Sequence, residues 1–462
     1  MTGGFYDNAL QTRSDYINVT AGARYYLTTI DNKVGGIRYA IYNSNKLFIS
    51  GALEPDTTDR AVVVTMPDNA AYLVMSFGRP INGQMFLGLY DGSTMDFFPF
   101  YEKIKDKYLN LNGNAPVLNL PAKLYALVGY ELNVYFENLT EHYEKYDWNV
   151  ICSKGMQLER GYRINPTADD VGTYTLSIRA SVSDDVFSEV TTTLIVTDAS
   201  AGSGVSKKVI VLGDSTTNNG IAVRKLNDNF SDDVMSIQTI GTRGTAPYKH
   251  EGRSGWRFSS YFGPPNSGDI AAGVENPWYN PTTETFDATY YFENTGIEKP
   301  DWLFINLGIN DTFGYTDDAV LGTQIEYCKS LCNSMISSIK SASPNTIISV
   351  CLTIPPNHSQ DAFGKAYSNG QTRNRYKRNN VLWVKSLIEE YDGRESEGIY
   401  LIPIYTNLDT VYNMGFETLP VNARNQDITY QSPIGNGGVH PVESGYWQIA
   451  DVYTAFLKAY AN

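Results

Sequence analysis

The chain has 462 residues, which corresponds to roughly two to four domains. Its 36 Lys and Arg are outnumbered by 50 Asp and Glu, and the formal net charge of −14 argues against nucleic acid and anionic membrane surfaces as partners. No apolar run approaches the roughly 20 residues of a membrane span, and the first residues lack the pattern of a signal peptide. The 34 Tyr are typical of extracellular β-rich proteins, so we expect a secreted, cell-surface or virion-associated location.

Residues 1–105 are predicted to form a β-sandwich module. Short β-branched and aromatic runs at 25–30, 37–42, 61–65 and 71–77 are separated by Gly, Asn, Asp and Pro. Runs of this length and spacing favour antiparallel strands joined by turns. Binding to a glycan or attachment is the role that we expect for this module.

A second β-rich region is predicted over 106–200. Apolar or alternating runs at 124–128, 132–136, 173–178 and 191–196 indicate strands, and the turn at 170–176 is similar to one in immunoglobulin-like sandwiches. The small and polar segment 198–205 is interpreted as a linker to the rest of the chain.

Residues 207–462 are predicted to form an α/β domain with a doubly wound, flavodoxin-like parallel sheet. The runs 208–212, 235–240, 302–307, 347–352 and 399–404 are apolar nearly throughout, which indicates strands buried on both faces. Helical patterns lie at 219–229, 322–342, 380–391 and 443–460. Such sheets place their sites at the carboxyl ends of the strands.

Two residues whose side chains could carry out acyl transfer lie next to these predicted elements. Ser215 comes directly after the first apolar strand, where a hydroxyl lies near the start of a helix. A serine nucleophile needs a base, and His440, one of four His in the chain, stands just before the last helix. The topology can bring these two residues together.

Four sequence blocks in this order resemble the SGNH hydrolases, also called the GDSL esterase/lipase family. The blocks are Gly213-Asp214-Ser215, Gly252-Arg253-Ser254-Gly255, Gly308-Ile309-Asn310-Asp311 and His440-Pro441. The resemblance implies that Ser215 is the nucleophile and His440 the general base. It also implies an oxyanion hole made by the backbone N–H groups of Ser215 and Gly255 and the side-chain amide of Asn310. No metal or cofactor is expected.

One element of the family pattern is missing. The family has Asp three positions before the catalytic His, where it orients the imidazole, and this chain has Gly437 there. Three interpretations remain open. Another group could orient His440, namely Asn436, Asp427, Glu251 or a backbone carbonyl. The enzyme could instead work as a Ser–His dyad, or the site could be inactive.

The expected substrate follows from the second block. Segment 250–256, His-Glu-Gly-Arg-Ser-Gly-Trp, is similar to the corresponding loop of carbohydrate acetylesterases, which implies removal of O-acetyl groups from a polysaccharide. Aromatic residues of the insert 258–300 could stack on sugars or simply pack the loop. The alternative function is a catalytically weak or inactive glycan-binding or structural protein, such as a phage tail fibre or adhesin. The four Cys are interpreted as small buried hydrophobes.

Overall fold

The computed structural model describes residues 12–13, 17–29, 37–54, 61–77, 85–90, 95–96, 115–183, 186–267, 270, 273–367, 370–433 and 437–461. The contacts between residues divide the chain into two compact units, 1–114 and 115–462. Each unit is described by itself.

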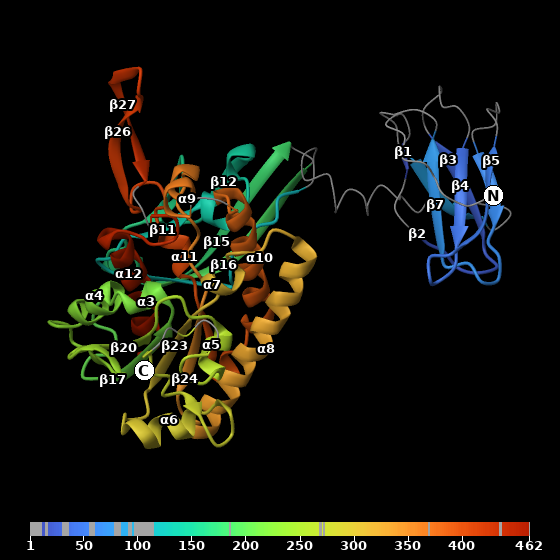
Figure 1. Cartoon of the computed structure of the whole chain (residues 1–462). Helices are drawn as coiled ribbons and strands as arrows, with labels where there is room; N and C mark the ends of the chain where they lie inside the picture. The colour runs from blue at the N-terminus through green and yellow to red at the C-terminus, as the bar shows by residue number, and fades with distance from the viewer. Residues whose placement is uncertain are drawn as a thin grey trace. The chain divides into compact units, whose positions relative to one another are not determined.

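The first unit consists of short antiparallel strands in two sheets (Figure 1). One sheet has the order β1-β7-β4-β5, with β2 also paired to β7: β1 (Thr12–Arg13), β2 (Ile17–Asn18), β4 (Ile37–Tyr42), β5 (Phe48–Glu54) and β7 (Tyr72–Phe77). The other has the order β6-β3-β8-β9: β3 (Arg24–Thr29), β6 (Ala61–Thr65), β8 (Met85–Tyr90) and β9 (Met95–Asp96). Side chains from both sheets, among them Tyr25, Ile41, Val64 and Leu73, form one buried cluster. The β-rich character predicted for this region is confirmed.

The second unit begins with another β-rich region. A four-stranded sheet has the order β10-β16-β15-β12: β10 (Lys123–Leu127), β12 (Asp147–Ile151), β15 (Gly172–Ser183) and β16 (Val186–Thr197). A three-stranded sheet has the order β11-β14-β13: β11 (Leu132–Tyr135), β13 (Met156–Leu158) and β14 (Gly161–Ile164). Short helices join them: α2 (Phe136–Leu139), η1 (Tyr143–Lys145) and η2 (Ala168–Asp170). The arrangement of two separate sandwiches stays a prediction.

A seven-stranded sheet forms the centre of this unit. Its order is β19-β20-β18-β17-β23-β24-β25, and only the edge strand β19 is antiparallel. The strands are β17 (Ser206–Gly213), β18 (Ser236–Thr239), β19 (Arg243–Thr245), β20 (Tyr248–Gly252), β23 (Trp302–Asn306), β24 (Ile347–Cys351) and β25 (Ile399–Ile402). The five predicted strands therefore lie in the order second, first, third, fourth and fifth, as in flavodoxin-like folds. The predicted α/β fold is confirmed.

Helices cover both faces of this sheet because its strands are apolar on both sides. On one face Ile210 and Leu212 belong to a buried cluster with α8 (Asp318–Ala342) and α10 (Arg373–Tyr391). On the other face Val209 and Val211 pack with α4 (Ile221–Asn229) and α12 (Glu443–Ala459). The alternation along β17 thus divides the core into two layers.

The remaining elements lie in the connections. They are α3 (Ser215–Asn218), α5 (Phe258–Phe262), β21 (Tyr279–Asn280), β22 (Thr285–Phe286), α6 (Ala288–Thr295), α7 (Ile309–Thr312), α9 (Gln360–Ala366), η3 (Glu395–Glu397), α11 (Ile404–Asn407), β26 (Phe416–Asn422) and β27 (Asn425–Pro433). Strands β26 and β27 form a hairpin that projects from its unit (Figure 1). Among the described helices none combines the length and apolar character needed to cross a membrane.

The β-rich region of 115–200 packs closely against the α/β part. Tyr125 of β10 contacts Phe456 of α12 edge to face, with ring centroids 5.2 Å apart. The predicted linker is also packed, because the buried Lys458 ammonium donates hydrogen bonds to the carbonyls of Ala199 and Ala201 at 2.8 and 2.9 Å. The division into 1–105, 106–200 and 207–462 stays a prediction, since both later parts lie in one compact unit.

Candidate functional site

Three parallel strands bring three of the sequence blocks together. Gly213, the last residue of β17, is in register with Gly252 at the end of β20 and with Asn306 at the end of β23. A Cβ atom on Gly252 would lie 2.5 Å from the backbone nitrogen of Asn218, so only glycine allows this approach. The loops that carry Ser215, Gly255 and Asn310 therefore begin at one edge of the sheet.

Ser215 is the first residue of α3. The fully buried Asp214 caps this helix, because its Oδ1 accepts hydrogen bonds from the backbone N–H and the hydroxyl of Thr216 at 2.9 and 2.7 Å. Burial raises the pKa of Asp214 to about 6, although the bonds from Thr216 favour its ionised form. The side chain of Asp214 thus holds the turn, while Ser215 is partly exposed.

His440 meets Ser215 across 225 positions of sequence. The distance between Ser215 Oγ and His440 Nε2 is 2.8 Å, which is a hydrogen-bond distance. Backbone pairing positions the histidine loop: Met414 forms a β-bridge with Pro441, and Asn357 N–H donates to the Gly438 carbonyl at 2.9 Å. An imidazole in this position can take the hydroxyl proton.

The two other predicted oxyanion donors lie in adjoining segments. Gly255 adopts a φ of +78°, and nothing lies within 4 Å of where its Cβ would be, so the space there is open. The Asn310 amide donates one hydrogen bond to the Trp256 carbonyl at 3.0 Å, and an amide group has a second N–H to offer. Neither Ser215 nor Gly255 donates its backbone N–H to another described residue. These are the donors that a developing oxyanion would need.

The start of α7 explains how Asn310 is held. Gly308 precedes the helix with a φ of +124°, and a Cβ atom there would lie 2.0 Å from Trp383 Nε1. Behind it, the buried Asp311 accepts hydrogen bonds from Phe258 N–H at 3.1 Å and from Cys328 Sγ at 3.3 Å. Burial raises the pKa of Asp311 to about 7, against these two bonds. Asp311 thus fixes the loop. Cys328, Cys332 and Cys351 are buried as predicted, whereas Cys152 is only partly buried.

Glu251, one candidate for orienting His440, has other partners. Its Oε1 accepts hydrogen bonds from the backbone N–H of Thr242 and from the hydroxyl of Tyr291, the latter at 2.7 Å. Its Oε2 forms an ion pair with Arg253 at 2.7 Å and accepts from Trp278 Nε1 at 3.3 Å. Because four groups already surround this buried carboxylate, the structure removes Glu251 from the candidates.

The other two candidates are Asp427 and Asn436. Asp427 is exposed on β27, three residues from the turn of the projecting hairpin, so it is not placed to orient His440 (Figure 1). Asn436 lies outside the described residues, and its role stays a prediction. Gly437 is described and buried.

Sequence reasoning missed the buried scaffold behind the second block. Arg253, only 2% exposed, pairs with Glu251, and the hydroxyl of Tyr261 donates to the carbonyls of Gly213 and Glu251 at 2.8 and 2.7 Å. His250 Nδ1 accepts from Gly252 N–H at 3.0 Å, and burial lowers the pKa of His250 to about 4, so it is neutral. The one signal in the sequence for this scaffold was the spacing of Glu251 and Arg253, an acidic and a basic residue two positions apart.

The aromatic residues of the insert divide into two groups. Trp278, Tyr291 and Phe292 are buried, with the first two stacked at a centroid distance of 3.6 Å, so they pack the loop and do not face a substrate. Tyr279 and Tyr290 line an open cavity of about 1040 Å³ beside β19. In the part of the chain that the structure describes, no group of three His, Cys, Asp or Glu side chains could hold a metal ion.

The comparison with family models agrees with this fold. Residues 209–452 match the family model described as GDSL-like Lipase/Acylhydrolase. This match spans more than half of the chain, which therefore belongs to that family and is a hydrolase that acts on esters. A search of curated proteins found no match.

Several solved structures resemble parts of the chain at low identity. A carbohydrate esterase family 3 protein from Talaromyces cellulolyticus is 16% identical with a TM-score of 0.31, over 54% of this chain and 95% of its own. An acetyl esterase mutant with acetate ion is 16% identical with a TM-score of 0.29, over 54% and 95%. A carbohydrate esterase family 2 enzyme with a carbohydrate binding domain, from Corynascus thermopiles (Myceliophthora fergusii), is 11% identical with a TM-score of 0.30, over 98% and 92%.

Proposed function

We propose that this chain is a serine esterase in which Ser215 attacks the ester carbonyl and His440 takes the hydroxyl proton. The observation that carries the proposal is the 2.8 Å distance between Ser215 Oγ and His440 Nε2 at the carboxyl edge of the sheet. His440 then donates this proton to the leaving alcohol. In the second half-reaction His440 takes a proton from water, the water attacks the carbonyl of the acyl-enzyme, and the proton returns to Ser215.

The oxyanion of the tetrahedral intermediate would be stabilised by three donors. They are the backbone N–H groups of Ser215 and Gly255 and the second N–H of the Asn310 amide. The first two groups make no other hydrogen bond to described residues, which supports this role. The group that orients His440 is proposed to be Asn436 or a backbone carbonyl, because Glu251 and Asp427 are engaged or placed elsewhere.

We further propose that the substrate is an O-acetyl ester on a polysaccharide. The support is the resemblance of segment 250–256 to the second block of carbohydrate acetylesterases. The same segment provides the turn with Gly255, whose open surroundings leave room for a substrate next to the nucleophile.

The test compares the wild-type chain with Ser215→Ala. The wild type should release acetate from p-nitrophenyl acetate and from acetylated xylan, and the variant should lose at least about 10³-fold in kcat while keeping its circular dichroism spectrum and Tm. A serine-directed phosphonate should label only the wild type. Full activity in the variant would refute the nucleophile assignment. A wild type that neither hydrolyses these esters nor is labelled by the phosphonate would instead favour a binding or structural protein. Gly437, in place of the family's Asp, is the feature that supports this alternative.

A further inference from the structure

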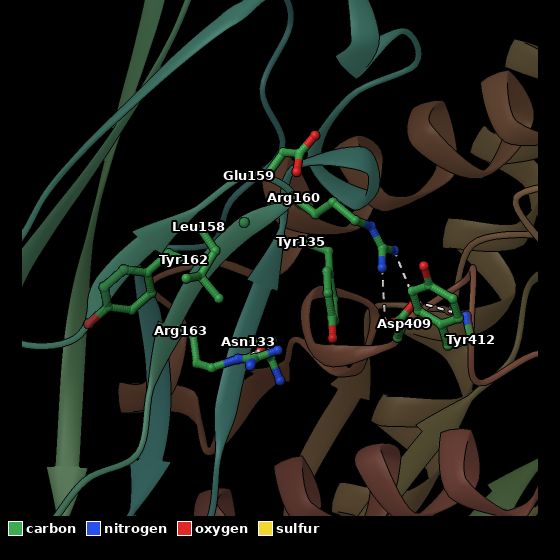
Figure 2. Close-up of a pocket in the computed structure, with 10 residues that line it drawn as sticks. Asn133, Tyr135, Leu158, Glu159, Arg160, Tyr162, Arg163, Asp409 and Tyr412 are labelled. Atoms are coloured by element: carbon green, nitrogen blue, oxygen red, sulfur yellow. Dashed lines mark hydrogen bonds and ion pairs between the residues drawn. The ribbon is translucent and has the colours of Figure 1, made fainter.

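A second candidate site lies between the β-rich region and the α/β part of the same unit (Figure 2). This pocket of about 280 Å³, called here the Arg160 pocket, is formed by residues of β11, β14 and the loop after α11. The residues used below are Asn133, Tyr135, Arg160, Arg163, Asp409 and Tyr412. Its volume is near the lower end of small-ligand pockets, which suits one small cyclic group.

Arg160 forms one wall of the pocket and is held there by ion pairs. Its guanidinium donates to Asp409 at 2.9 and 3.2 Å and to Glu137 at 2.7 Å. Burial opposes ionisation of Glu137, but the hydrogen bond from His358 and the charge of Arg160 lower its pKa to about 2. Two carboxylates therefore face the one cation of Arg160, so this wall carries a net negative charge, which makes it a poor site for a free anion.

Two aromatic rings flank the guanidinium. The centre of the Arg160 guanidinium lies 5.2 Å from the ring of Tyr135 and 5.4 Å from that of Tyr412, within the range of cation–π contact. Figure 2 shows Arg160 and Tyr412 converging on Asp409, whereas Tyr162 points away. Tyr412 remains 62% exposed, so most of its surface is available to a ligand.

Polar groups complete the other side. Arg163 Nε donates to Asn133 Oδ1 at 2.7 Å, and the Arg163 side chain is 37% exposed. Fixed donors and acceptors next to an exposed aromatic ring match a sugar, whose C–H face stacks on the ring while its hydroxyls exchange hydrogen bonds with charged groups. A purely apolar or anionic ligand would leave part of this lining unsatisfied.

The pocket is connected to His440 through the backbone. Two residues after Tyr412, Met414 forms the β-bridge with Pro441, which directly follows His440. The next pairing in this loop joins Val442 N–H to the Asn413 carbonyl at 3.0 Å. The loop that presents Tyr412 and the loop that presents His440 therefore run side by side.

From this geometry we propose that the Arg160 pocket binds a glycosyl residue of the polymer whose ester reaches Ser215, through stacking on Tyr412 and hydrogen bonds to Arg163 and Asp409. The proposal rests on the proposed polysaccharide esterase function and assigns the β-rich region a share in substrate binding. It also predicts that sugar binding does not require the acetyl group.

The experiment measures binding of deacetylated oligosaccharides by calorimetry, with the full chain carrying Ser215→Ala. Xylohexaose, mannohexaose and cellohexaose are the probes. For any probe that binds the Ser215→Ala chain, adding Tyr412→Ala should lower the affinity by about 3- to 10-fold. Adding Tyr412→Phe, which keeps the ring, should leave the affinity near that of the Ser215→Ala chain. Tyr327→Ala is the matched control, because Tyr327 is a comparably exposed tyrosine (49%) on α8, outside the pocket.

Each outcome decides the proposal. Sugar binding that falls in Tyr412→Ala but not in Tyr327→Ala supports it. No binding of any of the three probes, or equal affinity of both variants, would overturn it. The esterase assignment is tested separately by Ser215→Ala on p-nitrophenyl acetate, so an active esterase with an indifferent Tyr412 refutes the pocket alone. If Ser215→Ala keeps full esterase activity while sugar binding depends on Tyr412, only the assignment of Ser215 as the nucleophile is refuted.

Discussion

Gly213 shows how one small residue allows the three blocks to meet. A Cβ atom at this position would lie 2.3 Å from the hydroxyl oxygen of Thr217 and 2.8 Å from the carbonyl oxygen of Asn306. The end of β17 is thus enclosed by α3 and β23, and the following residues turn at once into the helix that begins with Ser215. The position of the hydroxyl depends on this close packing.

Asn310 offers a residue-scale test of the oxyanion hole. Asn310→Ala should lower kcat for p-nitrophenyl acetate by about 10²–10³-fold with a small change in KM, because the amide would act only on the charge that develops in the transition state. Steady-state kinetics measure this, and Asn374→Ala, at an exposed position of α10, is the control. A change confined to KM would contradict the assignment.

Asp311 makes a prediction about pH and stability. Its folded pKa of about 7 lies above the roughly 3.9 of an unfolded Asp, so between these values the folded state binds more protons. The contribution of Asp311 to stability is therefore present below about pH 4 and is lost as the pH rises towards 7. Asp311→Asn should flatten this part of the decline in the free energy of unfolding from pH 4 to 8, measured by urea titration. Identical slopes in both proteins would show that Asp311 ionises freely in the fold.

At the scale of elements, tertiary contacts extend helices beyond their apolar patterns. The prediction began one helix at 380, whereas α10 begins at Arg373. Its first turns are mostly polar and carry no apolar period, although Tyr376 is buried in the apolar core. Ion pairs of Arg375 and Arg378 with Asp318, at 2.7 and 2.5 Å, also hold these turns to the start of α8. These partners are about 60 positions away in the sequence and so leave no local signal.

The buried pair behind β20 predicts an effect on stability. Glu251→Gln removes the charge that balances Arg253, and both side chains are at most 2% exposed. Leaving such a cation unpaired should cost about 3–5 kcal/mol of unfolding free energy, seen as a lower Tm. Glu326→Gln, which removes an exposed partner of Lys329, should change Tm little. Equal Tm values for the two variants would contradict the structural role of Glu251.

At the scale of the whole molecule, the β-rich region of 115–200 belongs to the same compact unit as the α/β part. Tyr125 and Leu127 of β10 belong to the same buried cluster as Phe456 of α12. The Asn138 amide also donates to the carbonyls of Tyr405 and Leu408 at 2.7 and 2.8 Å. Removal of the region of 115–200 would therefore expose apolar surface of the α/β part and leave buried polar groups there unpaired.

Two truncated chains test this organisation. A chain of residues 115–462 should keep activity on p-nitrophenyl acetate, because none of the site residues lies in 1–114. A chain of residues 207–462 should be poorly soluble or melt at a much lower temperature, since α12 would lose the cover of β10. Melting curves and the soluble yield of both chains decide the matter. Equal stability would mean that the region of 115–200 is an independent module.

The sequence by itself determined the α/β fold and the residues to examine at its edge. Strands buried on both faces need nearly continuous apolar runs, and residues that follow such strands meet at one edge of a parallel sheet. Ser215 and His440 were found from their positions in this pattern, and the resemblance to the SGNH hydrolases added Gly255 and Asn310. Only the tertiary structure decided the partners of Glu251 and the docking of β10 on α12. A buried carboxylate takes whichever donors the fold brings to it, and two of the donors to Glu251, Trp278 and Tyr291, stand 27 and 40 positions away.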